Sequence, residues 1–542
     1  MPDIPGDTTT TATISVGGTL SDNIEVAGDH DWIRIDLTAG QSIVITLNGD
    51  TLSDPYLRLL NSSGTQLAVN DDYGGTLDSR ISFTATTTGT YYIDASAFGT
   101  ATGTYELAVT SPPVYTNDQI GTQLTGGYWT WSGSGPREFA VAPGGALSVN
   151  LTLLTAEGQF FARAALAMWS DALGITFNEV LSGGQITFDD NDSGAYASSV
   201  HTGGIITSSH VNIHTSWYAG DEGSLDNYSF QTYIHEIGHA LGLGHGGNYN
   251  GSAVYTTDAH YQNDSWATTI MSYFDQTENT YFAGQGFTFN YIGTPQVADL
   301  IAAHSMYGTP TTTRTGHTTY GFGSTAGRDV FNAALYPNIA YTIIDNGGID
   351  TLNYSGFATN QRINLNSETF SNIGSGVGNV NIARGTVIEN ALGGSGNDTM
   401  LGNAVANVLN GGAGNDNLQG NNGNDTLIGG IGADAMYGGN GADIYYADNA
   451  GDRAYESAVL GIDRVFSSVT FALGVNVEDL TLTGTATING FGNTLNNVMV
   501  GNSGNNVLNG SLGADTMSGG SGNDTYYVDN VGDRAIEASA AG

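Results

Sequence analysis

The stretch His235-Glu236-Ile237-Gly238-His239-Ala240-Leu241-Gly242-Leu243-Gly244-His245 decides the local fold, because its spacing fits one helix that ends in a sharp turn. His235 and His239 are four residues apart, so their imidazoles project from one face of a helix. Gly242 can adopt a left-handed conformation that ends the helix and lets His245 return toward the same point. The stretch therefore predicts three histidines around one metal ion, and Zn²⁺ suits their nitrogen donors.

Glu236 lies beside the first of these histidines, where its carboxylate can reach a metal-bound water rather than the metal. Three protein ligands leave one position open, which is the catalytic arrangement rather than the closed structural one. An apolar stripe at helical spacing supports the predicted helix and consists of Phe230, Ile234, Ile237 and Leu241. Ser229 is the predicted N-cap of this helix.

The extended motif, followed by Ile270-Met271-Ser272-Tyr273, resembles the metzincin clan of zinc endopeptidases. The run HEIGHALGLGHGGNYN resembles the serralysins in particular, which are secreted bacterial proteases with calcium-binding repeats, and the resemblance covers about residues 115 to 460. It implies that Met271 lies in a tight turn beneath the zinc site. It also implies that Tyr273 is a displaceable zinc ligand that helps zinc to stabilise the oxyanion.

The composition excludes several classes of protein. Lys and Arg number 12 and Asp and Glu number 52, which gives a formal net charge of −40. Such an acidic surface argues against nucleic acids and anionic membranes as partners, and it suits a protein that binds many divalent cations. The absence of cysteine excludes disulfides, thiol catalysis and thiolate metal sites. No run approaches the roughly 18 apolar residues of a membrane span, and the first residues do not resemble a secretory signal peptide.

Residues 1–112 have the pattern of an all-β sandwich, in which short alternating runs are separated by Gly, Asn, Asp and Ser. The runs lie at 32–37, 43–47, 56–60, 91–94 and 105–109. The segments Asp29-His30-Asp31-Trp32, Asp54-Pro55-Tyr56-Leu57 and Asn70-Asp71-Asp72 resemble the bacterial pre-peptidase C-terminal domain. Substrate docking, a removable pro-region and a solubilising spacer all remain open as roles for this accessory domain.

Ser111-Pro112-Pro113 is the predicted linker to an α/β catalytic domain at 115–309. The spacing predicts a helix over 156–173 and strands at 175–177, 185–188 and 211–214. The core face of that helix is predicted to comprise Phe160, Phe161, Ala164, Ala165, Met168 and Trp169. After the zinc helix, a last helix is expected with Pro295 at its first position and Gly308 past its end. This order suits a metalloprotease with a horizontal cleft.

Beyond residue 310, Gly and Asn increase and a period of nine residues emerges. From Gly393 the repeats run GGSGNDTML, GNAVANVLN, GGAGNDNLQ, GNNGNDTLI, GGIGADAMY and GGNGADIYY, and from Gly492 they run GNTLNNVMV, GNSGNNVLN, GSLGADTMS and GGSGNDTYY. The eighth residue of every repeat is apolar. Such repeats predict Gly-rich turns and short strands that coil into a parallel β-roll, with one block in 310–491 and a second in 492–542.

Most repeats carry Asp at the sixth position, where it faces its neighbours across the turns. Carboxylates and backbone carbonyls are hard oxygen ligands that suit Ca²⁺, so several calcium ions are predicted in addition to one zinc ion. The predicted ligands in the repeats are Gly394, Gly396, Asp398, Gly412, Gly414, Asp416, Gly423, Asp425, Gly430, Gly432, Asp434, Gly439, Gly441, Asp443, Asp515, Gly520, Gly522 and Asp524. Asn407, Asn497 and Asn506 replace Asp, so we expect their repeats to bind calcium weakly or not at all.

The resemblance to the serralysins implies further calcium ligands just before the roll. These are Arg314, Gly316 and Thr318 through backbone oxygens, together with Asp345, Gly347, Gly348, Asp350 and Glu389. His317 stands where the family usually has an acidic residue, so this sequence departs from the family pattern there.

Taken together, the motifs predict a secreted, extracellular zinc endopeptidase that hydrolyses proteins or peptides. Glu236 would take a proton from the attacking water and return it to the leaving amine. The alternative is a calcium-dependent surface or adhesion protein with a structural zinc site, and such a site has no use for Glu236. We further expect a monomer with no nucleic-acid partner and no membrane insertion.

The two blocks of repeats close with similar segments at 443–453 and 524–534, an offset of 524 − 443 = 81 residues. After the second segment, the sequence ends partway through a continuation that the first block completes. We predict that Gly542 is a processing boundary or the limit of a truncated fragment. The family resemblance implies further repeats and a C-terminal signal for a type I export machinery.

Overall fold

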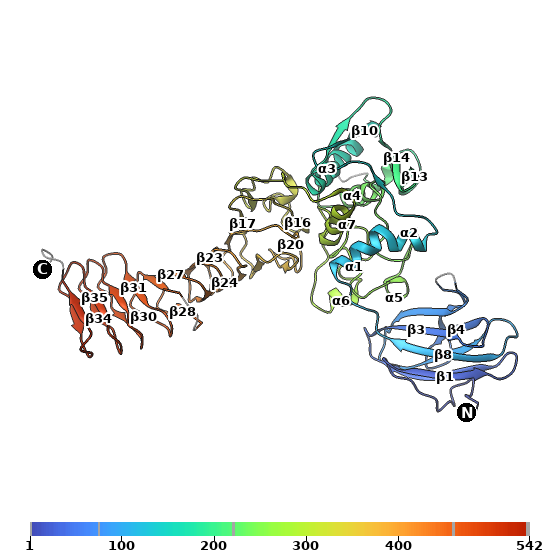
Figure 1. Cartoon of the computed structure of the whole chain (residues 1–542), viewed down its shortest axis with the longest axis horizontal. Helices are drawn as coiled ribbons and strands as arrows, with labels where there is room; N and C mark the ends of the chain where they lie inside the picture. The colour runs from blue at the N-terminus through green and yellow to red at the C-terminus, as the bar shows by residue number, and fades with distance from the viewer. Residues whose placement is uncertain (1–2, 74–75, 219–222, 458–460, 538–542) are drawn as a thin grey trace.

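The computed structural model describes residues 3–73, 76–218, 223–457 and 461–537. It shows an elongated chain in three parts: an N-terminal β-sandwich, a central α/β region and a long parallel β-roll (Figure 1). The sandwich lies on one side of the α/β region, and the roll extends from the other side. The predicted fold class is confirmed, whereas the domain boundaries at 112, 309 and 491 stay predictions.

The sandwich consists of two four-stranded sheets, ordered β1-β8-β3-β6 and β2-β7-β4-β5. Its strands are β1 (Thr19–Ile24), β2 (His30–Leu37), β3 (Ser42–Gly49), β4 (Pro55–Leu60), β5 (Gln66–Asn70), β6 (Ser79–Thr84), β7 (Gly89–Ala97) and β8 (Gly103–Thr110). In β2, Ile33, Ile35 and Leu37 are buried and alternate with more exposed polar residues. This two-residue period turns one face of each sheet toward a shared apolar core.

The α/β region contains one mixed sheet, ordered β11-β10-β12-β14-β13, with β9 paired to β14. Its strands are β9 (Glu138–Phe139), β10 (Ala146–Leu153), β11 (Thr176–Glu179), β12 (Ile186–Asp189), β13 (Ala195–Thr202) and β14 (Ile205–Ile213). Only β13 runs antiparallel to its neighbour, and it forms an edge of the sheet. The strand predicted at 211–214 is the end of the longer β14, and the sequence patterns had not indicated β13 as a strand.

Most of the helices of this region lie on one side of the sheet (Figure 1). The α-helices are α1 (Asn117–Thr122), α2 (Tyr128–Trp131), α3 (Ala156–Leu173), α4 (Tyr228–Ala240), α5 (Tyr255–Asp258), α6 (Thr280–Ala283) and α7 (Val297–Tyr307). The helix predicted over 156–173 is confirmed as α3, which begins after the Thr155 cap and ends at the left-handed Gly174. The prediction for Phe160 was wrong: this ring is 40% exposed, whereas its neighbour Phe161 is fully buried.

Two predicted helix starts are also corrected. The N-cap of α4 is Asn227, whose side chain accepts a hydrogen bond from the Phe230 amide at 2.8 Å. Ser229 lies inside the helix, where its hydroxyl donates to the carbonyl of Trp217. Helix α7 starts two residues later than predicted, because the capping box of Gln296 and Asp299 sets its first turn, and Pro295 precedes the cap.

Beyond α7 the chain winds into a roll whose longest sheet has eleven strands. These are β15 (Thr319–Gly321), β17 (Thr351–Asn353), β21 (Asn390–Leu392), β23 (Val408–Ala413), β25 (Thr426–Ile431), β27 (Ile444–Ala447), β29 (Arg464–Ser467), β31 (Asp479–Leu482), β33 (Val498–Val500), β35 (Thr516–Ser518) and β37 (Arg534–Ile536). Every pairing within this sheet is parallel.

The opposite wall of the roll is made by shorter sheets. Their strands are β16 (Tyr341–Ile343), β18 (Arg362–Asn364), β19 (Phe370–Ser371), β20 (Val380–Ile382), β22 (Thr399–Leu401), β24 (Asn417–Asn422), β26 (Ala435–Asn440), β28 (Arg453–Tyr455), β30 (Phe471–Ala472), β32 (Gly490–Phe491), β34 (Val507–Asn509) and β36 (Thr525–Tyr527). Successive repeats alternate between the two walls. Their eighth residues meet between the walls, where Leu409, Leu418 and Leu427 have no exposed surface.

The sandwich meets the α/β region at the linker and α5. Gln262 donates its side-chain amide to the Pro112 carbonyl at 2.6 Å and its backbone amide to the Pro113 carbonyl at 2.8 Å. The ring of Tyr115 stacks on that of Tyr261 at 4.5 Å. These contacts join the linker and Tyr115 to the segment that follows the third predicted zinc ligand.

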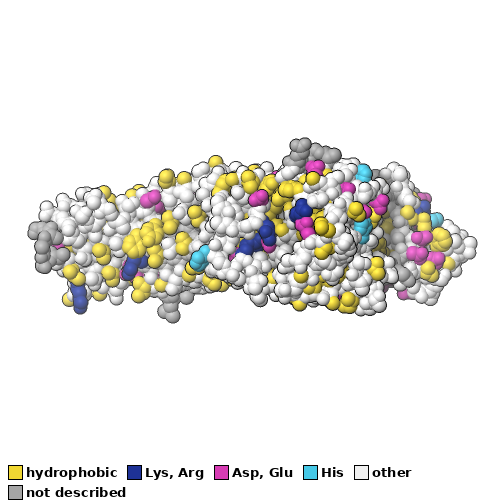
Figure 2. Space-filling model, turned by 90° about the horizontal axis from the view of Figure 1, so that it is seen from above, with side chains coloured by type: hydrophobic (Ala, Val, Ile, Leu, Met, Phe, Trp, Pro, Cys, Tyr) yellow, Lys and Arg dark blue, Asp and Glu magenta, His cyan; other side chains and the backbone are white. Residues whose placement is uncertain are grey.

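On the face shown in Figure 2, basic side chains lie in small separate groups rather than in one patch. This distribution agrees with the excess of acidic over basic residues in the whole sequence. Within the described ranges, no helix has both the length and the apolar character that a membrane crossing requires.

Candidate functional site

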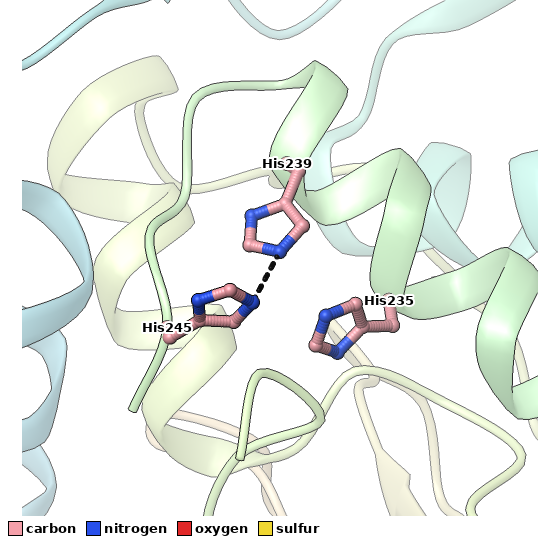
Figure 3. Close-up of side chains that lie close together, drawn as sticks. All are labelled: His235, His239 and His245. Carbon is pink, nitrogen blue, oxygen red and sulfur yellow. Dashed lines mark hydrogen bonds between the residues drawn. The ribbon is translucent and has the colours of Figure 1, made fainter. Parts of the chain in front are cut away.

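The three predicted zinc-binding histidines converge on one point (Figure 3). His235 and His239 project from one face of α4, and His245 comes from the segment beyond the helix end. One ring nitrogen from each histidine lies within 4.8 Å of the other two. The arrangement predicted from the spacing is therefore present.

The second nitrogen of each ring fixes the tautomer. The Nδ1 atoms lie 2.8–2.9 Å from backbone carbonyl oxygens, namely those of Ile270 for His235, Leu243 for His239 and Tyr249 for His245. A carbonyl can only accept, so each Nδ1 carries the proton and each Nε2 keeps its lone pair. The Nε2 atoms of His239 and His245 then face each other at 2.9 Å as two acceptors. A cation between them resolves this conflict, so the residues fit a zinc ion.

Burial keeps the three rings neutral. It lowers the pKa of His235 to about 4 and that of His239 to about 3, and it lowers the pKa of His245 well below its ordinary value. Neutral imidazole is the form that binds a metal, so no proton has to be displaced from these ligands near neutral pH.

Two glycines allow this geometry. Gly242 has φ +105°, and a Cβ at this position would collide with the carbonyl oxygen of Arg137. Gly238 faces Met271, and a Cβ there would lie 2.7 Å from the Met271 sulfur. Met271 is fully buried directly against the zinc helix, which agrees with its expected place in a turn beneath the site.

Asp299 of α7 holds that turn in position. Its carboxylate accepts hydrogen bonds from the Thr269 hydroxyl at 2.5 Å and from the Ile270 amide at 2.8 Å. The carbonyl of the same Ile270 accepts from His235, so Asp299 positions a ligand through one intervening residue. This role was not predicted from the sequence, although Asp299, the third residue of the helix after the Gln296 cap, is a capping signal.

Glu236 and His235 both line a cleft of about 590 Å³. The cleft is lined by Gly194, Ala195, Tyr196, Trp217, Tyr228, Gln231, Thr232, His235, Glu236, Asn250, Gly251, Ser252, Ala253, Trp266, Ile270, Ser272 and Tyr273. Oε2 of Glu236 is buried and has no hydrogen-bond partner among the described residues. Burial raises the pKa of this carboxyl to about 8. A carboxyl in this state can exchange a proton with a group in the cleft.

Tyr273 also lines the cleft, with its ring centroid 4.6 Å from that of His245. Its hydroxyl accepts a hydrogen bond from the Gly251 amide at 3.3 Å. Burial raises the pKa of this phenol to about 12, so it keeps its proton near neutral pH. The ring is thus close to the histidines, while its predicted role as a zinc ligand stays a prediction.

The roll contains a second set of donor atoms. In the first block, backbone amides at the sixth positions donate to carboxylates 18 residues further on, as Asp398 does to Asp416 at 2.7 Å and Asp416 to Asp434 at 2.8 Å. The other carboxylate oxygen is buried and without a hydrogen-bond partner among the described residues in Asp416, Asp425, Asp434, Asp443, Asp515 and Asp524. Unpartnered anionic oxygens in rows fit bound Ca²⁺.

The asparagines at the sixth position behave differently. Asn407 accepts from the Asn403 amide at 2.8 Å and donates to the Glu389 carbonyl at 3.1 Å. Asn506 likewise accepts from Asn502 and donates to the Ile488 carbonyl. Each amide therefore completes its own hydrogen bonds, which is consistent with the prediction that their repeats bind calcium weakly.

The ligands expected before the roll also gather together. Asp350 accepts from the Thr318 amide at 2.7 Å, and its own amide donates to Glu389 at 2.7 Å. A Cβ at Gly348 would lie 2.5 Å from the Gly316 carbonyl oxygen. Asp345 accepts hydrogen bonds from Tyr320 and from the Gly347 amide. Arg314 instead turns its side chain toward Asp171, and its backbone oxygen stays a predicted ligand.

His317, which departs from the family pattern, accepts a hydrogen bond from the Ile349 amide at 2.7 Å.

The row of acidic residues also extends past the repeats that the nine-residue period identified. It continues at Asp452, Asp463, Glu478 and Asp533, each of which accepts from a backbone amide in the preceding coil.

Comparison with known proteins gives three family matches. Residues 309–539 match "Peptidase M10 serralysin C terminal", and residues 148–301 match "Metallo-peptidase family M12B Reprolysin-like". Residues 29–97 match "Bacterial pre-peptidase C-terminal domain". The three matches fall on the roll, the α/β region and the sandwich, respectively.

Two curated relatives each match 54% of this chain. Metallopeptidase AprA of Pseudomonas marginalis is 38% identical over 315 residues, which are 54% of this chain and 66% of the relative. Serralysin B of Dickeya chrysanthemi is 37% identical over 319 residues, which are 54% of this chain and 65% of the relative. The chain thus spans slightly less than two thirds of the length of these relatives.

Proposed function

Because this chain is a serralysin-like metzincin that carries a pre-peptidase C-terminal domain, we propose that it is a secreted zinc-dependent endopeptidase. One observation carries the proposal: three neutral imidazoles aim their free Nε2 atoms at one point, and the unpartnered Glu236 carboxylate lies in the same cleft. A purely structural zinc site would not need a buried carboxylate beside its ligands.

His235, His239 and His245 would hold the zinc ion through their Nε2 atoms. When bound, zinc acidifies a water molecule and polarises the carbonyl of the scissile peptide bond. The carbonyls of Ile270 and Leu243 keep the imidazole rings oriented, because each accepts the Nδ1 proton of one ligand. The predicted oxyanion contact comes from Tyr273, whose hydroxyl would leave the Gly251 amide to reach the substrate.

Glu236 would act as general base and then as general acid. Its buried carboxylate takes a proton from the attacking water and returns it to the leaving amine. Burial raises the pKa of this carboxyl to about 8, so it can keep the transferred proton until the amine leaves.

The substrate would lie along the edge of the sheet. Gly194, Ala195 and Tyr196 line the cleft, and the last two begin the edge strand β13. Because β13 pairs with β14 on one side only, its other side can bind an extended peptide by backbone hydrogen bonds. This recognition suits protein substrates of varied sequence, since the backbone is common to all of them.

We assign calcium binding to the roll and expect the protein to work outside the cell. The unpartnered carboxylate oxygens of the roll support calcium as their ligand. Extracellular calcium is abundant, whereas the cytoplasm holds little, so folding coupled to calcium suits an exported protein.

The test combines zinc content with casein hydrolysis. Wild-type protein should contain one zinc ion and hydrolyse casein. Glu236→Gln should keep the zinc and lose activity by about 10²–10⁴-fold, because only the proton acceptor is removed. Glu106→Gln on the exposed face of the sandwich is the matched control and should remain fully active. A zinc-loaded wild-type protein without hydrolysis would favour the alternative of a calcium-dependent surface protein.

A further inference from the structure

One wall of the cleft comes from a short segment that leads into α5. Residues 250–253 line the cleft, and α5 begins two residues later. Helix α5 has only four residues, and so short a helix is not stable by itself in water. The position of this wall therefore depends on what packs against α5.

Helix α5 contributes to a small apolar cluster that is separate from the large core. The cluster consists of Tyr249, Tyr255 and Phe274, and Tyr273 packs against it. The ring centroids of Tyr255 and Phe274 lie 5.5 Å apart, and those of Tyr249 and Tyr273 lie 4.9 Å apart. The Tyr273 hydroxyl also accepts a hydrogen bond from the amide of Gly251, which belongs to the wall. A shift of α5 would therefore change the position of this hydroxyl.

The same helix lies against β6 of the N-terminal sandwich (Figure 1). Only a gap of about 10 Å³ is left between them, which has room for about one water molecule. The gap lies between Ser82, Phe83 and Thr84 of β6 and Tyr255, Thr256 and Ala259 at α5. The hydroxyl oxygen of Ser82 is buried and has no hydrogen-bond partner among the described residues. The two elements are thus closely packed.

The contact with the N-terminal part continues beyond α5. Burial, together with the positive charge of Arg80 in β6, lowers the pKa of His260 to about 4. The imidazole is therefore neutral near pH 7 and can lie near the guanidinium without repulsion. Its centroid is also 5.9 Å from that of Tyr115, which follows the linker.

The sandwich does not enter the cleft itself. The described residues that line the cleft all lie between positions 194 and 273. The sandwich therefore does not block the cleft, as an inhibitory pro-region would. Its removal would instead take away packing from α5, where Tyr255 is now only 3% exposed. A simple spacer would have no reason to pack there.

We propose that the N-terminal sandwich is a permanent support of the active site, in which β6 holds α5 so that the wall at 250–253 and the Tyr273 hydroxyl stay in position. The proposal rests on the proposed endopeptidase function and gives the sandwich a part in it. Ser82 and its neighbours in β6 are positioning residues, because they act through α5 and do not touch the substrate.

Ser82→Trp in the full chain tests the support, because a large ring in the gap must move β6 away from α5. It should lower kcat on a casein peptide about 10–100-fold, with zinc content unchanged. Ser21→Trp, at an exposed position of β1 in the same sheet, is the matched control and should keep the wild-type kinetics. In a Tyr273→Phe background, Ser82→Trp should cause little further loss, because the displaced hydroxyl is already absent.

Two kinetic results would overturn the proposal. One is a normal kcat in Ser82→Trp, and a raised KM at that kcat would assign the sandwich to substrate docking instead. The other is an equal loss of kcat in the Tyr273→Phe and wild-type backgrounds, because Ser82 would then not act through the tyrosine hydroxyl.

Hydrogen exchange of the wild-type chain covers the case in which Ser82→Trp does not fold. Segment 254–262 should be protected together with β6, because α5 can open only when it leaves the sandwich. Exchange of 254–262 as fast as in an unfolded chain would refute the support. This measurement does not depend on proteolysis. Wild-type protein that fails to hydrolyse casein would refute the proposed function and would leave the exchange result unaffected.

Discussion

The cleft that contains His235 and Glu236 and the roll both aim buried, unpartnered donor atoms at places where a cation fits, but their donors differ in charge. In the cleft the donors are neutral imidazoles held by backbone carbonyls of Ile270, Leu243 and Tyr249. In the roll they are carboxylates such as Asp416 and Asp425, each of which has at least one acidic neighbour in its row. One continuous apolar core underlies both regions: it packs against α3 and α4 in the α/β region, whereas each regular repeat of the roll adds its eighth side chain, such as Leu409, Leu418 or Leu427.

This difference indicates how each region responds to loss of its ion. Neutral ligands on a packed helix can keep their positions without the metal, because little repulsion is released. Stacked carboxylates cannot, because their charges are close and partly removed from water. We therefore expect the roll to fold only when calcium is bound. Loss of zinc should abolish activity but should not unfold the cleft.

Removal of calcium should give the largest effect. Dialysis of the full chain into calcium-free buffer that contains zinc should unfold most of 310–537, while the α/β region stays folded. Hydrogen exchange measured segment by segment would report the loss of protection. Equal protection of the roll with and without calcium would contradict the comparison. Removal of zinc at saturating calcium is the control, and it should leave exchange in both regions nearly unchanged.

Tyr273→Phe should separate catalysis from metal binding in the cleft. Loss of the hydroxyl should lower turnover about 100-fold, because one donor to the oxyanion is removed. Zinc content should remain at one ion, since the three histidines stay in place. Steady-state kinetics on a casein peptide would measure the change. A variant with normal turnover would make Tyr273 a packing residue only.

Gly242→Ala should disturb the turn that brings in the third ligand. The left-handed φ and the collision with the Arg137 carbonyl should lower the free energy of unfolding of the α/β region by about 1–3 kcal/mol. Zinc affinity should fall as well, because His245 shifts. Thermal unfolding followed by near-ultraviolet circular dichroism measures the first effect. Gly286→Ala is the control for backbone strain alone, because Gly286 also has a positive φ but a Cβ added there would have no atom within 4 Å.

The pH dependence of the calcium-free roll should give the smallest effect. Burial raises the pKa of Asp416 and Asp425 from 3.8 to about 7, so the folded state holds their protons more tightly than the unfolded state does. Their contribution to stability is then complete below the ordinary value and is lost as the pH rises through 7. Without calcium, the roll should keep more strand structure at about pH 4 than at about pH 8. Circular dichroism that shows no change, or the opposite change, would contradict the charge argument.

Much of this molecule could be predicted from local patterns. The four-residue spacing of His235 and His239 and the glycine at 242 were enough to predict the convergence of three imidazoles. The regular apolar eighth residues likewise predicted the interior of the roll, and Ala156–Leu173 is helical over the full predicted range. Each of these features depends on residues close together in sequence, so the pattern contains the information.

The rest depends on contacts between distant segments. The edge strand β13 exists because it pairs with β14, and its own alternation is weak. Asp299 supports the predicted zinc ligand His235 from a helix much later in the sequence, and no periodicity reveals such a contact. Asp463 and Glu478 continue the row of carboxylates with altered spacing, so a search with a fixed nine-residue period passes over them. Asn227 was missed as a cap because Ser229 offered an equally plausible signal.

The alternation of repeats between the two walls of the roll limits how its length can change in evolution. One coil spans two repeats, or 18 residues, as the hydrogen bond from Asp416 to Asp434 shows. Gain or loss of a whole coil leaves every later strand on its own wall, whereas gain or loss of a single repeat moves all later strands to the opposite wall. The two block ends are separated by an odd number of repeats. Tyr445 lies in β27 of the long sheet, whereas Tyr526, at the same place in its own block, lies in β36 of the opposite wall. The length of the roll can therefore change freely only by pairs of repeats, because a single added or lost repeat moves every later strand to the opposite wall.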